Sequence, residues 1–254
     1  MRKSVFSHIM KRYIVSFLFL SFCLLALPYT LVIDAGHGGK DPGAQSRTAK
    51  EKNINLAVAL ALGKLVEQNC PDVKVVYTRK TDVFVELDER AQIANRAKAD
   101  LFISIHTNAT PAKIGPQGTE TYTLGMHRAA DNLAVAKREN SVITLESNYE
   151  EKYEGFDPNS SESYIIFELM QDRNMESSVK LADLIQKQFR NTAKRIDKGV
   201  HQAGFLVLRA TSMPSVLIEL GFINNPSEAA YLTSTASVNA LAKSIYNAFV
   251  AYKK

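Results

Sequence analysis

The 254-residue sequence has little cysteine, and from Leu31 onward it has no internal repeat, no Gly/Ser linker and no low-complexity tract. Two cysteines, Cys23 and Cys70, cannot supply the disulfide framework of a small secreted scaffold. Hydrophobic residues make up 46% of the chain and charged residues 22%, a balance that excludes a disordered chain or a collagen. We therefore expect one globular domain with its own hydrophobic core.

The first 26 residues contain no acidic side chain. They carry four cationic side chains followed by the uncharged run Tyr13–Leu27, which together are typical of an export signal. Four of the five net positive charges of the chain therefore belong to this leader. The remaining chain is almost neutral, so we expect no nucleic-acid-binding surface.

We predict that residues 1–28 form a signal peptide cleaved near Ala26, and that the protein is exported, most simply to the periplasm. The apolar run of 15 residues is short for a bilayer span, which needs about 20 apolar residues. An uncleaved anchor, through which alone the protein would meet a membrane, is one alternative, and a cell-surface location is another. A lipoprotein modified at Cys23 is disfavoured by the bulky Phe22 before it. Cys70 would be the only thiol of the mature chain, with a packing role.

Residues 29–254 are predicted to form a single α/β domain with a twisted, largely parallel sheet that has helices on both faces. Short apolar runs predict strands at Leu31–Ile33, Val73–Tyr77, Leu101–Ile105, Thr119–Leu124 and Val216–Leu220. Amphipathic spacing predicts helices at Asn53–Gln68, Asp88–Lys98, Glu176–Lys194 and Ser237–Tyr252. In such a sheet, binding sites gather where the strands end.

Polar side chains follow three of these strands. His37 lies in the glycine-rich segment after the first strand, His106 at the end of the third, and Glu219 within the last apolar run. Glu51 falls in the first turn of the next helix, from which its carboxylate can reach the same edge. Two imidazoles and one carboxylate with an open fourth position are a known ligand set for catalytic zinc, and a second carboxylate then serves as the base.

Each of these residues also has a purely structural alternative. Thr48 and Glu51 have the spacing of a helix capping box, and His106 is compatible with a hydrogen-bonded core histidine. Glu219 is the hardest to explain this way, because an unpaired buried carboxylate costs several kcal/mol. A cationic group is therefore expected beside it.

Four separated motifs resemble the zinc-dependent N-acetylmuramoyl-L-alanine amidases of the Amidase_3 family. They are LVIDAGHGGKDPGA (31–44), Glu51, SIHTNA (104–109) and PSVLIELGFINN (214–225), with further likeness at 78–82 and 87–95. The resemblance covers about residues 31–254. It implies that His37, Glu51 and His106 bind one Zn²⁺ and that Glu219 is the catalytic carboxylate. Ala35 and Thr107 depart from the usual family residues, but neither removes a functional group.

The implied reaction is hydrolysis of the peptidoglycan amide that joins N-acetylmuramic acid to L-alanine of the stem peptide. Two alternatives stay open. The same zinc chemistry would serve a peptidase that cleaves another bond of the stem, and a protein that had lost catalysis would only bind peptidoglycan.

An acidic segment interrupts the pattern between the fourth predicted strand and the helix near Glu176. From Glu139 to Asp172 it has nine acidic residues and one basic residue, Lys152. A segment of about residues 127–175 resembles the insertion of division amidases that stay inactive until a partner protein displaces a blocking helix. We therefore predict that a carboxylate from this insertion closes the zinc site and that an activator displaces it. The alternative is a solvated acidic surface segment.

Overall fold

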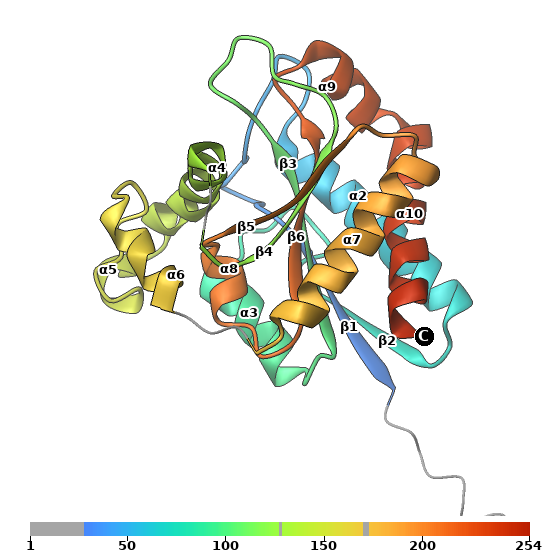
Figure 1. Ribbon diagram of the computed structural model, residues 1–254, viewed down its shortest axis with the longest axis horizontal. Coiled ribbons are helices and arrows are strands. Elements are labelled where there is room, and N and C mark those ends of the chain that lie inside the picture. Colours follow the sequence, from blue (N-terminus) through green and yellow to red (C-terminus); the bar gives the residue numbers. More distant parts are fainter. Residues whose placement is uncertain (1–27, 127–128, 170–172) are drawn as a thin grey trace, which may run out of the picture.

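The computed structural model describes residues 28–126, 129–169 and 173–254, so almost all of the predicted signal peptide, with Cys23, lies outside the described residues. A six-stranded sheet crosses the molecule and has helices on both faces (Figure 1). In spatial order its strands are β2 (Val73–Tyr77), β1 (Tyr29–Ala35), β3 (Leu101–Asn108), β6 (Ser215–Phe222), β4 (Thr119–Leu124) and β5 (Asp197–Ala203). The predicted α/β class is confirmed.

The sheet is largely parallel, as predicted. Every neighbouring pair of strands is parallel except β4 and β6, which run antiparallel. Five of the strands were predicted from apolar runs, and β5 was not predicted. The reason is that β5 is an edge strand whose residues are mostly half-buried and largely polar, so no apolar run marks it.

Three long helices cover one face of the sheet. They are α2 (Glu51–Asn69), α7 (Met175–Asn191) and α10 (Thr235–Lys253), and α10 packs against both of the others (Figure 1). Each begins and ends within three residues of the predicted bounds. The strand residues that point into this layer are all aliphatic and fully buried: Leu31, Ile33, Ile103, Ile105, Val216 and Ile218. Buried Cys70 packs in the same core, in agreement with its predicted role.

The opposite face carries α3 (Leu87–Arg96), which was predicted, and the short α8 (Leu206–Arg209), which was not. Val32, Phe102 and Leu217 point into this second core. The helix α9 (Pro226–Thr233) follows β6 and has Asn225 as its N-cap, with Oδ1 of Asn225 accepting from the Ser227 amide. The two buried clusters therefore lie on opposite faces of the sheet, one beneath the long helices and the other beneath α3 and α8.

The acidic segment folds into short helices on the second face. They are α4 (Ala130–Asn140), η1 (Ser141–Leu145), α5 (Tyr149–Lys152), η2 (Glu162–Ile165) and α6 (Ile166–Leu169), and we call residues 129–169 the insert. The insert contributes buried apolar side chains to the second core: Val135, Val142, Ile143, Tyr153, Phe156, Tyr164 and Phe167. A solvated acidic segment is therefore a wrong description of this part of the chain.

Within residues 28–126, 129–169 and 173–254, none of the helices combines the length and the apolar character needed to cross a bilayer.

Candidate metal centre

The loop after β1 presents the first histidine. His37 has φ of 63°, a left-handed conformation that is uncommon for a residue with a side chain. Gly36, just before it, leaves room for a close neighbour, because a Cβ there would lie 2.3 Å from Nε2 of His106. The missing side chain of Gly36 thus lets the second histidine pack directly against the loop.

Two buried arginines donate hydrogen bonds to the backbone at the start of this loop. Arg90 donates to the carbonyl oxygens of Ala35 (2.8 Å) and His37 (2.9 Å), and to Oδ1 of Asp34 (2.7 Å). Arg79 donates to the carbonyl oxygens of Ala35 (2.8 Å) and Gly36 (2.9 Å). Burial alone would raise the pKa of Asp34, but the charge of Arg90 outweighs it and lowers that pKa. A buried ion pair therefore fixes the backbone that carries His37.

Strand register places the second histidine and the predicted base side by side. His106 on β3 is paired with Glu219 on β6, so both side chains leave the sheet on the same face. Both are buried. The end of the parallel strands is thus where the predicted site residues meet, as expected.

Glu51 reaches this site from the first residue of α2. Its Oε2 accepts from the amide of Ala44 (2.8 Å), and its Oε1 accepts from the amide of Thr107 (2.8 Å). The capping-box alternative is wrong, because the N-cap of α2 is Lys50 and no side chain caps the helix. The Glu51 carboxylate instead connects the loop after β1 to the end of β3 through these two hydrogen bonds.

Four buried side chains converge at this point. His37 Nε2 lies 3.1 Å and His106 Nδ1 lies 3.2 Å from Oε1 of Glu51. The fourth member is Glu139 of the insert, whose Oε2 lies 3.1 Å from His37 Nε2 and 2.9 Å from His106 Nδ1. One ligand atom from each residue falls within 4.8 Å of all the others, so the group can hold a metal ion.

The convergent atoms are short of hydrogen-bond partners. Among the described residues, His37 Nε2, His106 Nδ1 and Glu139 Oε2 are buried and make no hydrogen bond. Buried polar atoms are almost always paired, so such a cluster calls for a further group between them. The other ring nitrogen of His37, Nδ1, lies 2.6 Å from Oδ2 of Asp41, which fixes the ring with Nε2 toward Glu51 and Glu139.

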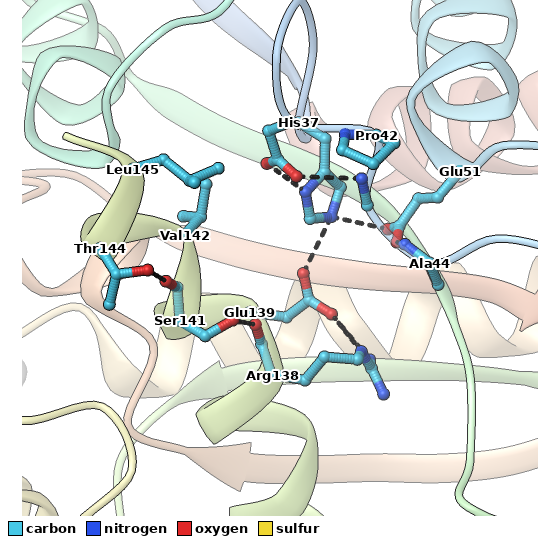
Figure 2. A pocket seen from close by; sticks show the side chains of 12 residues that line it. His37, Pro42, Ala44, Glu51, Arg138, Glu139, Ser141, Val142, Thr144 and Leu145 are labelled. Carbon is cyan, nitrogen blue, oxygen red and sulfur yellow. Dashed lines mark hydrogen bonds and ion pairs between the residues drawn. The ribbon is translucent and has the colours of Figure 1, made fainter.

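Figure 2 shows how Glu139 enters the site: it extends from α4 toward His37, while Arg138 contacts its other oxygen. Arg138 Nη2 lies 2.7 Å from Glu139 Oε1 and 3.4 Å from Glu219 Oε1. Arg138 is therefore the cation that was expected beside Glu219. A cavity of about 330 Å³ lies between this end of α4, η1 and the His37 loop.

The charges of the cluster shift its pKa values strongly. Burial alone would lower the pKa of His106, but the Glu139 carboxylate outweighs it and raises that pKa to about 9. Burial would raise the pKa of Glu139, yet Arg138 and His106 lower it well below its ordinary value. Burial, then Glu139, raise the pKa of Glu219 well above its ordinary value. The Glu139 carboxylate therefore stays ionised, and Glu219 is a weaker acid than an exposed carboxyl.

The structure brings together all four residues singled out from the sequence, His37, Glu51, His106 and Glu219. Sequence reasoning left the insertion carboxylate unidentified and did not identify Arg138 or Asp41 as site residues. Glu139 was one of nine acids with no local feature to distinguish it, because only the docking of α4 brings it to the histidines. For Asp41, a signal was available, since an acid four residues after a ligand histidine is able to bond its second ring nitrogen.

The fold is thus an α/β domain whose sheet edge brings two imidazoles and two carboxylates together in a group that could hold a metal ion. Residues 31–251 match the Amidase_3 family, described as N-acetylmuramoyl-L-alanine amidase. The chain belongs to this family.

Individual relatives agree. The chain is 31% identical over 248 residues to the probable N-acetylmuramoyl-L-alanine amidase AmiB of Haemophilus influenzae, covering 96% of this chain and 57% of that protein. It is 31% identical over 226 residues to the amidase AmiA of Escherichia coli, covering 87% of this chain and 75% of AmiA. It thus spans little more than half the length of AmiB.

A solved structure shares the fold. The N-acetylmuramoyl-L-alanine amidase of Clostridium difficile 630 superposes with a TM-score of 0.67 at 28% identity, covering 90% of this chain and 98% of that one. The fold described above is therefore that of an amidase catalytic domain.

Proposed function

We propose that this protein hydrolyses the amide bond between N-acetylmuramic acid and L-alanine of peptidoglycan, with one zinc ion held by His37, Glu51 and His106. Membership of the amidase family supports the reaction class. The observation that carries the proposal is the meeting of both imidazoles with one oxygen of Glu51, at 3.1 and 3.2 Å.

The donor set fits zinc. Ligands about 2.0 Å from a tetrahedral zinc ion lie about 3.3 Å from one another. The four contacts among His37, Glu51, His106 and Glu139 measure 2.9 to 3.2 Å, close to that spacing. Imidazole nitrogen and carboxylate oxygen are ligands that zinc accepts, and a set without thiolate is typical of catalytic sites.

Bound zinc supplies Lewis acidity, which polarises an amide carbonyl and makes water a stronger acid. The protein supplies the proton transfers. Glu219 is beside His106 in the sheet and its Oε2 has no hydrogen-bond partner among the described residues. We assign it to take a proton from the attacking water and to pass it to the leaving amine.

Mass spectrometry of purified muropeptides incubated with the zinc-loaded mature protein tests this reaction. Release of intact stem peptides that begin with L-alanine is expected. Cleavage inside the stem would instead favour the peptidase alternative. Binding without any cleavage, in a chain freed of inhibition by the insert, would favour a peptidoglycan-binding protein.

We infer that Glu139 keeps the site closed. With Glu139 among the ligands the four-coordinate set is complete, and no position remains for water and substrate. The neighbouring Asn140 helps to dock the helix: its Oδ1 accepts from the amide of Leu206 (2.9 Å) and its Nδ2 donates to the carbonyl of Gly204 (2.7 Å). The insert therefore acts as an inhibitory lid in this proposal.

A second set of contacts, made by Glu146 directly after η1, also docks the insert. Glu146 is buried and accepts from the amide of Leu87 at the start of α3 (2.8 Å) and from the hydroxyl of Tyr153 (2.8 Å). A negative charge at a helix N-terminus is stabilising. An activator protein that binds the insert must break these contacts, as well as those of Asn140, to withdraw Glu139.

Deletion of residues 140–170 would be a poor test of the lid. It would leave Glu139 in the chain and would remove buried aromatic side chains of the second core, including Tyr153 and Tyr164. A point substitution at Glu139 is the sharper test.

The proposed substrate lies outside the cytoplasm, which agrees with the export signal predicted for residues 1–28. We propose a periplasmic location. Immunoblotting of periplasmic and membrane fractions, compared with a chain that lacks residues 2–26, tests this location. Finding the full-length chain in the cytoplasm would contradict it.

A further inference from the structure

A second and larger cavity lies on the other side of α4 from the His37 loop. Its volume is about 620 Å³, within the range of small-ligand sites. The end of β3, strand β4 and the loop between them form its floor, and α4 forms one wall. Arg138 of α4 lines both this cavity and the cavity at His37, so the two cavities adjoin at this residue.

Strand register leads from the metal centre directly into this cavity. His106 on β3 is paired with Glu219 on β6, and Glu219 is paired in turn with Glu120 on β4. Paired residues point to the same face of a sheet, with Cβ atoms about 5 Å apart. A row of three side chains therefore runs from the metal ligand through the proposed base to Glu120.

Glu120 is built into the cavity wall as a hydrogen-bond acceptor. Its Oε2 accepts from Nδ2 of Asn108 (2.9 Å) and from the hydroxyl of Tyr122 (3.0 Å). Its Oε1 has Lys198 Nζ at 4.0 Å as its nearest ion-pair partner. Only 9% of Glu120 is exposed. Two donors thus orient Oε2, whereas Oε1 has only the longer contact to Lys198, which also lines the cavity.

Asn108 adds a second acceptor. Its Nδ2 is occupied by Glu120, which fixes the orientation of the amide and leaves Oδ1 buried with no partner among the described residues. Only 1% of Asn108 is exposed, and it lines the same cavity. A buried acceptor without a donor carries a free-energy cost, so the site is complementary to a ligand with N–H or O–H groups.

We propose that this cavity binds the first residues of the stem peptide, with Glu120 and Asn108 as specificity-determining acceptors for its N–H groups. The inference rests on the proposed amidase function. Glu219 must reach the leaving nitrogen, so the peptide side of the scissile bond lies next to Glu219. The side chain that follows Glu219 in this row, on the side away from His106, is Glu120.

The spacing agrees with a peptide. An extended chain advances about 3.3 to 3.6 Å per residue, so the N–H group that follows L-alanine lies about one residue beyond the leaving nitrogen. The step from Glu219 to Glu120 is longer, at about 5 Å between Cβ atoms, but the two carboxylate side chains are long enough to reach groups one residue apart. Phe222, Val135 and the ring of Tyr122 provide apolar surface in the cavity for the alanine methyl group and the following methylene groups. The sugar then lies on the His37 side of the metal.

A binding experiment tests the assignment without any need for turnover. The probes are the dipeptide L-alanyl-D-isoglutamine and the disaccharide GlcNAc-MurNAc, titrated into the full chain and into E120Q, N108A and the exposed control E176Q. The dipeptide is expected to bind about tenfold more weakly to E120Q, which loses a charged acceptor, and to N108A, which loses a neutral one. Its affinity for E176Q is expected to equal that for the wild type. The disaccharide is expected to bind all four proteins alike.

Three outcomes would overturn the assignment. One is that the dipeptide does not bind the wild-type chain. Another is that its affinity for E120Q and N108A equals its affinity for the wild type. The third is that the affinity of the disaccharide, and not that of the dipeptide, falls in these two variants. Thermal melting of each variant shows whether the fold is intact, and N108A probes the same subsite if E120Q unfolds.

A kinetic comparison separates this subsite from the proposed function. MurNAc-L-Ala and MurNAc-L-Ala-D-isoGln differ only in the residue that Glu120 would bind, so the gain in kcat/KM from the second residue should fall about tenfold in E120Q, mainly through KM. A merely structural role would lower the rates on both substrates equally. The rates are compared in the E139A background, in which the proposed inhibition by the insert is removed. Dipeptide binding that depends on Glu120, in an E139A chain that hydrolyses neither substrate, would support the subsite and contradict the amidase function.

Discussion

Oε2 of Glu139 lies 2.9 Å from Nδ1 of His106, although the two residues come from different layers of the fold. His106 ends a central strand, whereas Glu139 belongs to a helix of the insert. The contact links the position of the insert to the proposed metal centre. In the proposed mechanism, a movement of α4 that withdraws Glu139 opens one ligand position beside both histidines.

Removal of this carboxylate should activate the protein. We expect E139A to keep its metal, because His37, Glu51 and His106 remain, and to release peptidoglycan fragments about tenfold faster or more, since the closed state loses its contact with the metal centre. Release of dye-labelled cell wall measures the rate. The matched control is E150A, an exposed acid of the same insert. Equal rates in E139A and wild type, with the metal retained, would reject the inhibitory role.

Glu219 should be needed for turnover but not for the metal. E219Q keeps the size of the side chain and removes its ability to accept a proton, so we expect one bound zinc and a rate at least about a hundredfold lower. E139A provides the background in which the rate is high enough to measure. Substantial activity in E139A/E219Q would show that another group transfers the proton.

Asp41 should determine how tightly the metal binds. Its Oδ2 lies 2.6 Å from Nδ1 of His37 and holds the ring for coordination through Nε2. Loss of such an outer contact typically weakens metal binding roughly 10- to 100-fold, and we expect a change of this size in D41N. Competition with a fluorescent chelator measures the affinity, with the exposed Asp183 as the control in D183N. An unchanged affinity in D41N would mean that the loop alone orients His37.

The buried pair of Asp34 and Arg90 should make stability depend on pH. The folded-state pKa of Asp34 lies below its ordinary value of 3.8, so its contribution is complete above that value and is lost as the pH falls through the folded-state pKa. We expect D34N to lower the free energy of unfolding by about 3 kcal/mol at pH 7, because it leaves the Arg90 charge buried and unpaired. Urea unfolding should show the gap between wild type and D34N narrowing below pH 4. A gap that is constant with pH would contradict the ion pair.

Much of the fold could be predicted because buried strands and amphipathic helices leave regular patterns. The central strands, such as β3 and β6, are buried on both faces and are marked by apolar runs. The edge strand β5 lacks such a run, because its residues are only half-buried and polar side chains are tolerated there. The insert helices that follow α4 have five residues or fewer, which are too few turns to show a period.

The site residues that lie on or next to parallel strands could be predicted from the sequence. His37 follows β1, and His106 and Glu219 lie in the second halves of β3 and β6, so their proximity follows from the parallel pairing of these strands. Glu139 could not be identified in this way, because its position depends on tertiary contacts such as those of Asn140 with Gly204 and Leu206. The position of Glu120 was equally hidden, since it results from the antiparallel pairing of β4 with β6.

The zinc content of purified wild-type and H106A chains tests the metal centre most directly. We expect one zinc per wild-type chain and less than about a tenth of that in H106A at the same free zinc concentration, because a catalytic site of this kind needs both imidazoles. Equal zinc in the two proteins, with H106A folded, would show that the metal lies elsewhere and would contradict the proposed centre.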